Sequence, residues 1–386
     1  MSDSTLSGLS QIPEAQPTNP FSAPFTLPTT PSKPRAHGHK RSASILKALS
    51  TYTETVTDLY KVTPIPNKGL GVQALSVIPA GTRITSEAPI LKCLREPDGI
   101  DPFPVYEAFE SLKPAAQDEY SLLSASQNQI ENALDCIDDD DDLPEGLREW
   151  IAKIAAIFEC NNFEIGAQSE VQDDGSVMTL AGVFPLAARM NHSCRPNVAQ
   201  TWNAEINQLT IHAIRDIQPG EELCDAYCLL VEDTATRQTG LDAYGFVCAC
   251  EVCGGNEEER KKSDEKRRLI KRLGEDLTFQ AERKTADGAA KLGPLTSSVV
   301  KGGLEDPVNA LEYLEVLLKE EGLVGHDLAQ WYSFANWHSV SNSLDGSIDW
   351  QQKNYDLNVI TKGRDHADTI AAKTKLARLK KRKSRK

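Results

Sequence analysis

Two kinds of hydrophobic pattern alternate along this chain of 386 residues. Residues 1–57 are rich in Pro, Ser and Thr and hold few large hydrophobic side chains, which predicts a disordered segment. From residue 58 the pattern changes to short β-like runs that are broken by glycine. Residues 103–160 are different, because apolar positions between Leu147 and Phe158 share one helical face. The order of these patterns predicts that the first half of the chain contains strands followed by helices.

A second β region and a helical region follow. Val198–Trp202 and Leu209–Ile214 are candidate strands, joined by a turn around Asn203–Asn207. Glu257–Leu277 is a candidate helix, and Asp306-Pro307 offers an N-cap and a first-turn proline for another. We therefore expect a mixed α+β protein with a helical C-terminal region at residues 256–372.

Composition narrows the class of protein. Hydrophobic residues make up 40% of the chain and charged residues 25%, as in globular proteins. No apolar run approaches the ~20 residues that span a bilayer, and the first residues lack the features of a secretory signal. We expect no membrane partner and a location in the nucleus, the cytoplasm or both.

Charge is distributed unevenly. The formal net charge is −14, yet residues 373–386 contain nine Lys and Arg and no acid, so the rest is more acidic still. An acidic body suits basic protein substrates and argues against broad nucleic-acid binding. We expect this basic tail to be solvated and flexible. A nuclear import signal or a nucleic-acid tether is the alternative interpretation.

Cysteine usage points to a metal site. The nine cysteines are an odd number, which disfavours a disulfide framework. Three of them form a C-x-C-x2-C cluster: Cys248, Cys250 and Cys253. With Cys194 they would supply the four ligands of a structural zinc ion, although Cys224 and Cys228 are rivals for the fourth position. Three buried structural thiols are the alternative.

Other single motifs are weak alone. Lys68-Gly69-Leu70-Gly71 has glycines that would let a ligand approach the backbone, but ordinary hairpin turns share this pattern. It lacks the strand-to-helix context of a dinucleotide fold, so a Rossmann interpretation is disfavoured. Tyr227 or His192 alone would more often be structural than catalytic.

Their order along the chain is more specific. Asn191-His192-Ser193-Cys194-x-Pro196-Asn197 is followed by Gly220-Glu221-Glu222-Leu223-x3-Tyr227 and by Tyr244-x-Phe246-x-Cys248-x-Cys250-x2-Cys253. Together with the Lys68–Gly71 motif, this combination resembles the SET-domain protein methyltransferases over about residues 58–255. Cys160-Asn161-Asn162-Phe163 and Phe184-Pro185 resemble the SET-and-MYND branch.

The resemblance implies a fold and a function. The fold is an α+β SET fold of short sheets with a pseudoknot, a helical insert at about 103–160 and a post-SET zinc loop. The function is S-adenosyl-L-methionine-dependent methylation of a lysine in a protein substrate, with a histone tail and chromatin as possible partners. A catalytically silent SET module, acting as a zinc-stabilised chromatin or protein-interaction adaptor, is the alternative.

The resemblance also implies roles for residues. Tyr227 would be the active-site tyrosine. Cys194, Cys248, Cys250 and Cys253 would hold the zinc. The residues that would bind S-adenosyl-L-methionine are Lys68, Gly69, Leu70, Gly71, Asn161, Asn191, His192 and Phe246.

This chain also departs from the family's pattern. A MYND zinc finger would need paired Cys or His between about Leu91 and Phe103, where only Cys93 is present. Asp225-Ala226 precedes Tyr227, where the family more often has apolar or small residues. We therefore expect a chain without a MYND finger and with an acid near the lysine channel.

Overall fold

The computed structural model describes most of the chain after residue 56. The described residues are 57–95, 101–138, 143–144, 146–171, 177–287, 295, 304–337 and 343–385. Apart from its last residue, the segment 1–57 that we predict to be disordered lies outside these residues.

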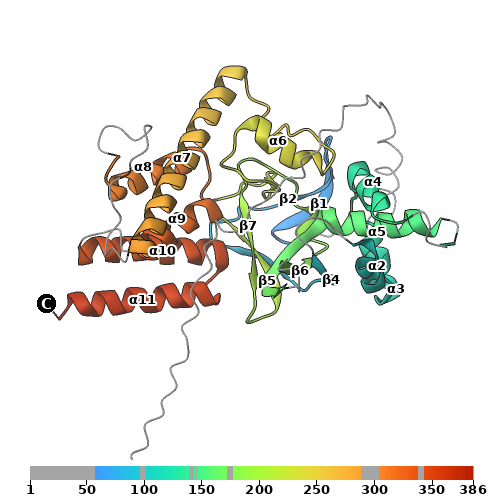
Figure 1. Cartoon of the computed structure of the whole chain (residues 1–386), viewed down its shortest axis with the longest axis horizontal. Coiled ribbons are helices and arrows are strands. Elements are labelled where there is room, and N and C mark those ends of the chain that lie inside the picture. The colour runs from blue at the N-terminus through green and yellow to red at the C-terminus, as the bar shows by residue number, and fades with distance from the viewer. Residues whose placement is uncertain are drawn as a thin grey trace, which may run out of the picture. The chain divides into compact units, whose positions relative to one another are not determined.

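Short antiparallel strands form three sheets within the described residues (Figure 1). The first sheet has the order β1 (Tyr60–Ile65), β2 (Gly69–Ala74) and β9 (Glu222–Leu223). The second has the order β3 (Arg83–Glu87), β8 (Gln208–Ala213) and β7 (Val198–Asn203). The third has the order β4 (Leu91–Arg95), β6 (Val177–Val183) and β5 (Asn162–Val171). Each sheet thus joins strands from distant parts of the sequence.

The predicted hairpin at residues 198–214 is confirmed. β7 pairs with β8 from Val198 opposite Ala213 to Asn203 opposite Gln208. Asn207 in the turn has a φ of 54°, a left-handed conformation that asparagine tolerates better than most residues. The turn therefore fixes the register that buries the inner face of the hairpin.

The predicted helical insert comprises four helices among its described residues. They are α2 (Pro102–Glu110), α3 (Pro114–Ser121), α4 (Gln127–Asp135) and α5 (Leu147–Asn161). Asp101 and Ser126 cap α2 and α4 by accepting hydrogen bonds from backbone N–H groups of the first turn. Ile151, Ile154 and Phe158 of α5 are at most 1% exposed, which confirms the predicted apolar face.

After β9, the described elements of the chain are helices. They are α6 (Thr234–Asp242), α7 (Glu257–Asp287), α8 (Pro307–Glu320), α9 (His326–Trp337), α10 (Leu344–Lys362) and α11 (Ala367–Lys383). The predicted start of α8 is confirmed, since the Asp306 side chain accepts hydrogen bonds from Val308 N and Asn309 N. α7 extends beyond the predicted end at Leu277. No helix in the described part of the chain is long and apolar enough to cross a membrane.

The expectation of a flexible basic tail is wrong for most of its length. Residues up to Lys383 belong to α11, which packs against α10 and buries Thr369, Ala372 and Leu376. Gln351 of α10 donates a hydrogen bond of 3.0 Å to Ala372 O. The basic side chains therefore project from an ordered helix, because three small or apolar positions are enough to attach it.

Gly274 of α7 lies where the helix meets α9. A Cβ atom at this position would lie 2.6 Å from Cζ2 of Trp331, which is far inside van der Waals contact. We predict that Gly274→Ala destabilises the protein by about 1–2 kcal/mol, although alanine normally favours a helix by about 1 kcal/mol. Urea unfolding of the full chain measures the change. Gly274→Ala should cost less in a Trp331→Leu background than in the parent, and a more stable Gly274→Ala protein would contradict the packing argument.

Candidate functional site

The chain around Asn191–Asn197 runs beside the chain that follows β9. His192 and Asp225 form a parallel bridge, in which Asp225 N donates to Asn191 O and Ser193 N donates to Asp225 O, both at 3.0 Å. Asn197 N donates to Cys224 O at 3.1 Å. Two of the motifs that are separated in sequence are therefore adjacent in space.

The Asn197 side chain strengthens this pairing. It is 2% exposed, and its Oδ1 accepts from Cys224 N at 2.8 Å while its Nδ2 donates to Glu222 O at 2.8 Å. An amide is the right group here because it accepts and donates at once, as the strand edge requires.

The β1–β2 turn joins the same place through Glu222. Lys68 Nζ lies 2.7 Å from Glu222 Oε2, and Asn191 Nδ2 donates to Glu222 Oε1 at 2.8 Å and to Leu70 O at 3.2 Å. Burial would lower the pKa of Lys68, but the hydrogen bond to Glu222 raises it above its ordinary value. A Cβ atom on Gly71 would lie 2.7 Å from Asn191 Nδ2, so the strand needs glycine at this approach.

Aromatic rings gather around Tyr227. Its ring centroid lies 4.8 Å from that of Tyr244, 5.6 Å from that of His192 and 6.4 Å from that of Phe246. The Tyr227 hydroxyl donates to Met190 O at 2.7 Å. Burial, together with negative charge nearby, raises the pKa of Tyr227 above its ordinary value, so the hydroxyl is neutral.

His192 connects this aromatic group with the thiols. Burial lowers the pKa of His192 to about 4, so its ring is neutral near pH 7. Nδ1 accepts from Tyr227 N at 3.0 Å, which assigns the ring proton to Nε2. Nε2 lies 3.3 Å from Cys194 Sγ and donates toward it.

Asn161 occupies a different environment. Its Nδ2 donates to Ser124 O and Ile157 O, both at 2.7 Å and both in the helical insert. The residue ends α5, just before β5 begins. Its recorded contacts therefore tie the insert together, and its role toward a cofactor stays a prediction.

Four thiols lie close enough together to hold a metal ion. The sulfur atoms of Cys194, Cys248, Cys250 and Cys253 lie within 4.8 Å of one another. Those of Cys194 and Cys253 are 3.5 Å apart, whereas tetrahedral zinc with Zn–S bonds of ~2.3 Å needs about 3.8 Å between sulfurs. Hydrogen bonds among the four thiols lower the pKa of Cys250 and raise the pKa of Cys194, so the cluster favours a thiolate at Cys250. This donor set fits a structural zinc ion.

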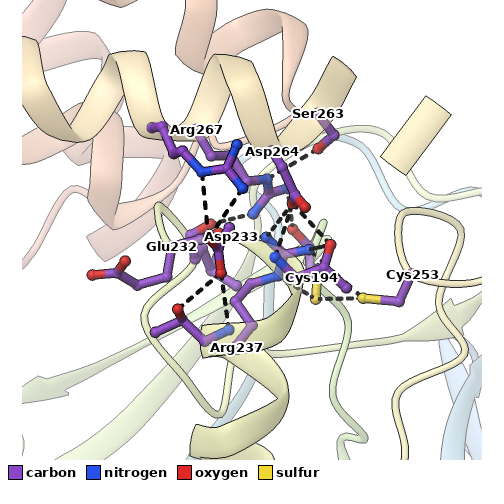
Figure 2. Close-up of polar contacts among 12 residues, drawn as sticks. Cys194, Glu232, Asp233, Arg237, Cys253, Ser263, Asp264 and Arg267 are labelled. Carbon is purple, nitrogen blue, oxygen red and sulfur yellow. Dashed lines mark hydrogen bonds and ion pairs between the residues drawn. The ribbon is translucent and has the colours of Figure 1, made fainter. Parts of the chain in front are cut away.

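α6 supplies two residues that the sequence motifs did not point to. Gln238 Nε2 donates to Phe246 O at 2.8 Å, and Gln238 Oε1 accepts from Cys248 N at 3.0 Å. Arg237, the neighbouring residue, lies beside Cys194 and Cys253 (Figure 2). In the sequence both stand in a polar stretch with little apolar periodicity, which gave no sign of burial.

Comparison with known proteins identifies the family. The SET domain model matches residues 69–228. The putative SET domain-containing protein L678 of Acanthamoeba polyphaga mimivirus is 30% identical over 216 residues, which cover 50% of this chain and 76% of that protein. The chain therefore belongs to the SET-domain family, and its α+β fold of short antiparallel sheets and helices is a SET fold. Whether the chain threads as a pseudoknot stays a prediction.

Two relatives carry activity names. The histone-lysine N-methyltransferase set5 of Schizosaccharomyces pombe is 33% identical over 216 residues, covering 55% of this chain and 56% of that protein. The human N-lysine methyltransferase SMYD2 is 36% identical over 104 residues, covering 27% of this chain and 22% of that protein. The chain thus spans about half the length of the first relative and about a fifth of the second.

Asp225 supplies a test of the site's electrostatics. Burial raises the pKa of its half-buried carboxyl to about 7. The folded protein therefore holds this proton more tightly than the unfolded chain does, and it loses stability as the pH rises from about 4 to about 7. We predict that Asp225→Asn gains about 1–3 kcal/mol relative to the parent across this interval, measured by urea unfolding at several pH values. A difference that does not change with pH would contradict the assignment.

Proposed function

We propose that this protein is an S-adenosyl-L-methionine-dependent protein-lysine N-methyltransferase. The observation that carries the proposal is the meeting of the Asn191–Glu222–Lys68 cluster with the rings around Tyr227 in a chain of the SET-domain family. Together they supply a polar cradle and an aromatic wall side by side.

The polar cradle suits a cofactor with a charged amino-acid end and a flat adenine. Asn191, His192 and the backbone of Lys68–Gly71 would hold it, with Phe246 against the adenine. Gly69 has a φ of 79°, and a Cβ placed there would meet no atom within 4 Å, so space adjoins this turn. Asn161, in the insert, is proposed for the same role by resemblance alone.

The aromatic wall suits a lysine side chain. S-adenosyl-L-methionine would supply a methyl group, which leaves its sulfonium sulfur as the new nitrogen–carbon bond forms. The protein's task is to align the amine and to keep water out. A lysine amine has a pKa of ~10.4 in water, and a desolvated channel favours its neutral form. The Tyr227 hydroxyl donates to Met190 O, so its oxygen lone pairs are left to orient the amine.

We infer a basic protein segment as substrate. The chain carries a net charge of −14, and Asp225 stands two residues before Tyr227. One relative is named as a histone-lysine methyltransferase and another as an N-lysine methyltransferase, so a histone tail is one candidate among basic proteins. A nuclear or cytoplasmic location, with chromatin association, agrees with either substrate.

Methyl transfer tests the proposal directly. We expect the full chain to transfer labelled methyl from S-adenosyl-L-methionine to core histones or to proteins of a cell extract. Tyr227→Phe should lower the rate about 10-fold or more, because one hydrogen bond to the reacting amine is worth about 1.5 kcal/mol or more. Titration calorimetry on both proteins should show similar cofactor affinity.

The two measurements separate the alternatives. Cofactor binding without transfer to any protein would favour the silent adaptor module. A parent protein that does not bind S-adenosyl-L-methionine would overturn the enzyme assignment.

The contact between His192 and Cys194 links the proposed cofactor site with the metal site. We predict that Cys194→Ser loses bound zinc and also weakens cofactor binding about 10-fold, since the ring of His192 then rests on a segment that no metal ion holds in place. Zinc content by elemental analysis and calorimetry measure the two effects. Cys228→Ser is the matched control, because Cys228 is a half-buried neighbour outside the four-thiol group. Unchanged cofactor affinity in a zinc-free Cys194→Ser protein would contradict the link.

A further inference from the structure

Two arginine side chains are buried next to the four thiols. Arg237 of α6 is 1% exposed and Arg267 of α7 is 0% exposed. A buried guanidinium costs free energy unless it has an anion and hydrogen-bond acceptors close by. Arg267 has Glu321 at 3.1 Å, but the nearest carboxylate to Arg237 is Asp264, at 3.8 Å.

Arg237 directs its donors at sulfur atoms. Its Nε donates to Cys194 Sγ at 3.2 Å, and its Nη2 lies 3.7 Å from Cys253 Sγ (Figure 2). The remaining donors bind Glu232 O and Thr234 Oγ1, which fixes the plane of the guanidinium. The guanidinium therefore makes two sets of hydrogen bonds. One set stabilises the start of α6, and the other contacts two of the four thiols.

A metal ion explains why a cation is buried there. Four thiolates carry twice the charge of one divalent zinc ion, so a filled site keeps excess negative charge in a poorly hydrated interior. Hydrogen bonds to a metal-bound sulfur lower the charge that it donates and fix the direction of its lone pairs.

We propose that Arg237 is a positioning residue of the metal centre, which holds the sulfurs of Cys194 and Cys253 by N–H···S hydrogen bonds and offsets the charge of the four thiolates. Arg237 binds no metal itself. The proposal requires a metal ion at the four thiols and is independent of methyl transfer.

Arg267 provides an internal comparison. Its Nη2 donates to the backbone oxygen of Cys194 at 3.0 Å, and its other donors bind Leu230 O, Ser263 Oγ and Glu321 Oε2. It is as deeply buried as Arg237 and also donates to Cys194, but its hydrogen bonds go to oxygen. Loss of Arg267 should therefore cost stability without changing the sulfur–metal bonds.

The test uses the full chain with cobalt(II) in place of zinc. The thiolate-to-cobalt charge-transfer band reports the electron density on sulfur, because a hydrogen bond stabilises the sulfur lone pairs. We expect Arg237→Gln to move this band to lower energy and to raise the rate of metal transfer to a chelator about 10–100-fold. Arg237→Lys keeps one charged donor and should lie between Arg237→Gln and the parent.

Two controls make the outcome decisive. Arg267→Gln should lower the urea midpoint and leave the band where it is in the parent. Arg268→Gln removes a guanidinium that is bound to Asp233 on the surface. It should change neither the charge-transfer band nor the rate of metal transfer to the chelator. If Arg237→Gln does not fold, Arg237→Lys carries the test. A charge-transfer band at the same energy in both Arg237 variants and the parent would overturn the proposal and leave Arg237 as a residue that only stabilises the start of α6. A parent chain that binds no metal would also overturn the proposal.

Discussion

The pairing of Asn191–Asn197 with residues 222–225 is the constraint on which the rest of the site depends. It is a short run of backbone hydrogen bonds, and the buried amide of Asn197 completes it by donating to Glu222 O and accepting from Cys224 N. Neither segment could hold this position alone, because each would leave polar backbone groups buried without partners. With the pairing in place, one segment presents Asn191 toward the β1–β2 turn and Cys194 toward the thiols, while the other presents Tyr227.

Burial sets the protonation states within this frame. A neutral His192 ring can accept from the Tyr227 backbone and donate toward Cys194 at the same time, which a charged ring could not do. The Tyr227 hydroxyl is likewise kept neutral by burial. The directions of neutral hydrogen bonds therefore organise the centre of the site. Charged groups lie at its periphery, where Lys68 pairs with Glu222 and Arg237 contacts the thiols. That arrangement suits alignment of two reactants better than proton transfer.

Sequence motifs predict many elements of the fold. They predict few of the residues that support the site through hydrogen bonds. The β7–β8 hairpin, the buried face of α5 and the cap of α8 follow from local rules, since turn, periodicity and capping residues act on near neighbours. Arg237 and Gln238 could not be predicted because their contacts lie outside α6, with Cys194 before the helix and with Phe246 and Cys248 after it. Residues 373–383 resemble a flexible tail in composition because lysines and arginines dominate there, but they continue a helix that Thr369, Ala372 and Leu376 attach to the protein.

The C-terminal helices are built into the site rather than appended to it. Arg267 of α7 donates to Cys194 O and pairs with Glu321, which follows α8, while Arg195 donates to Glu321 O. A buried ion pair of this kind is costly unless each partner is fully placed, so it selects one docking arrangement more than it adds stability. His326 and His366 reach the strand β7 through the backbone oxygens of Gln200 and Trp202. The C-terminal helices therefore contact both Cys194 of the four-thiol group and the edge strand β7, so the metal centre and this sheet share one helical support.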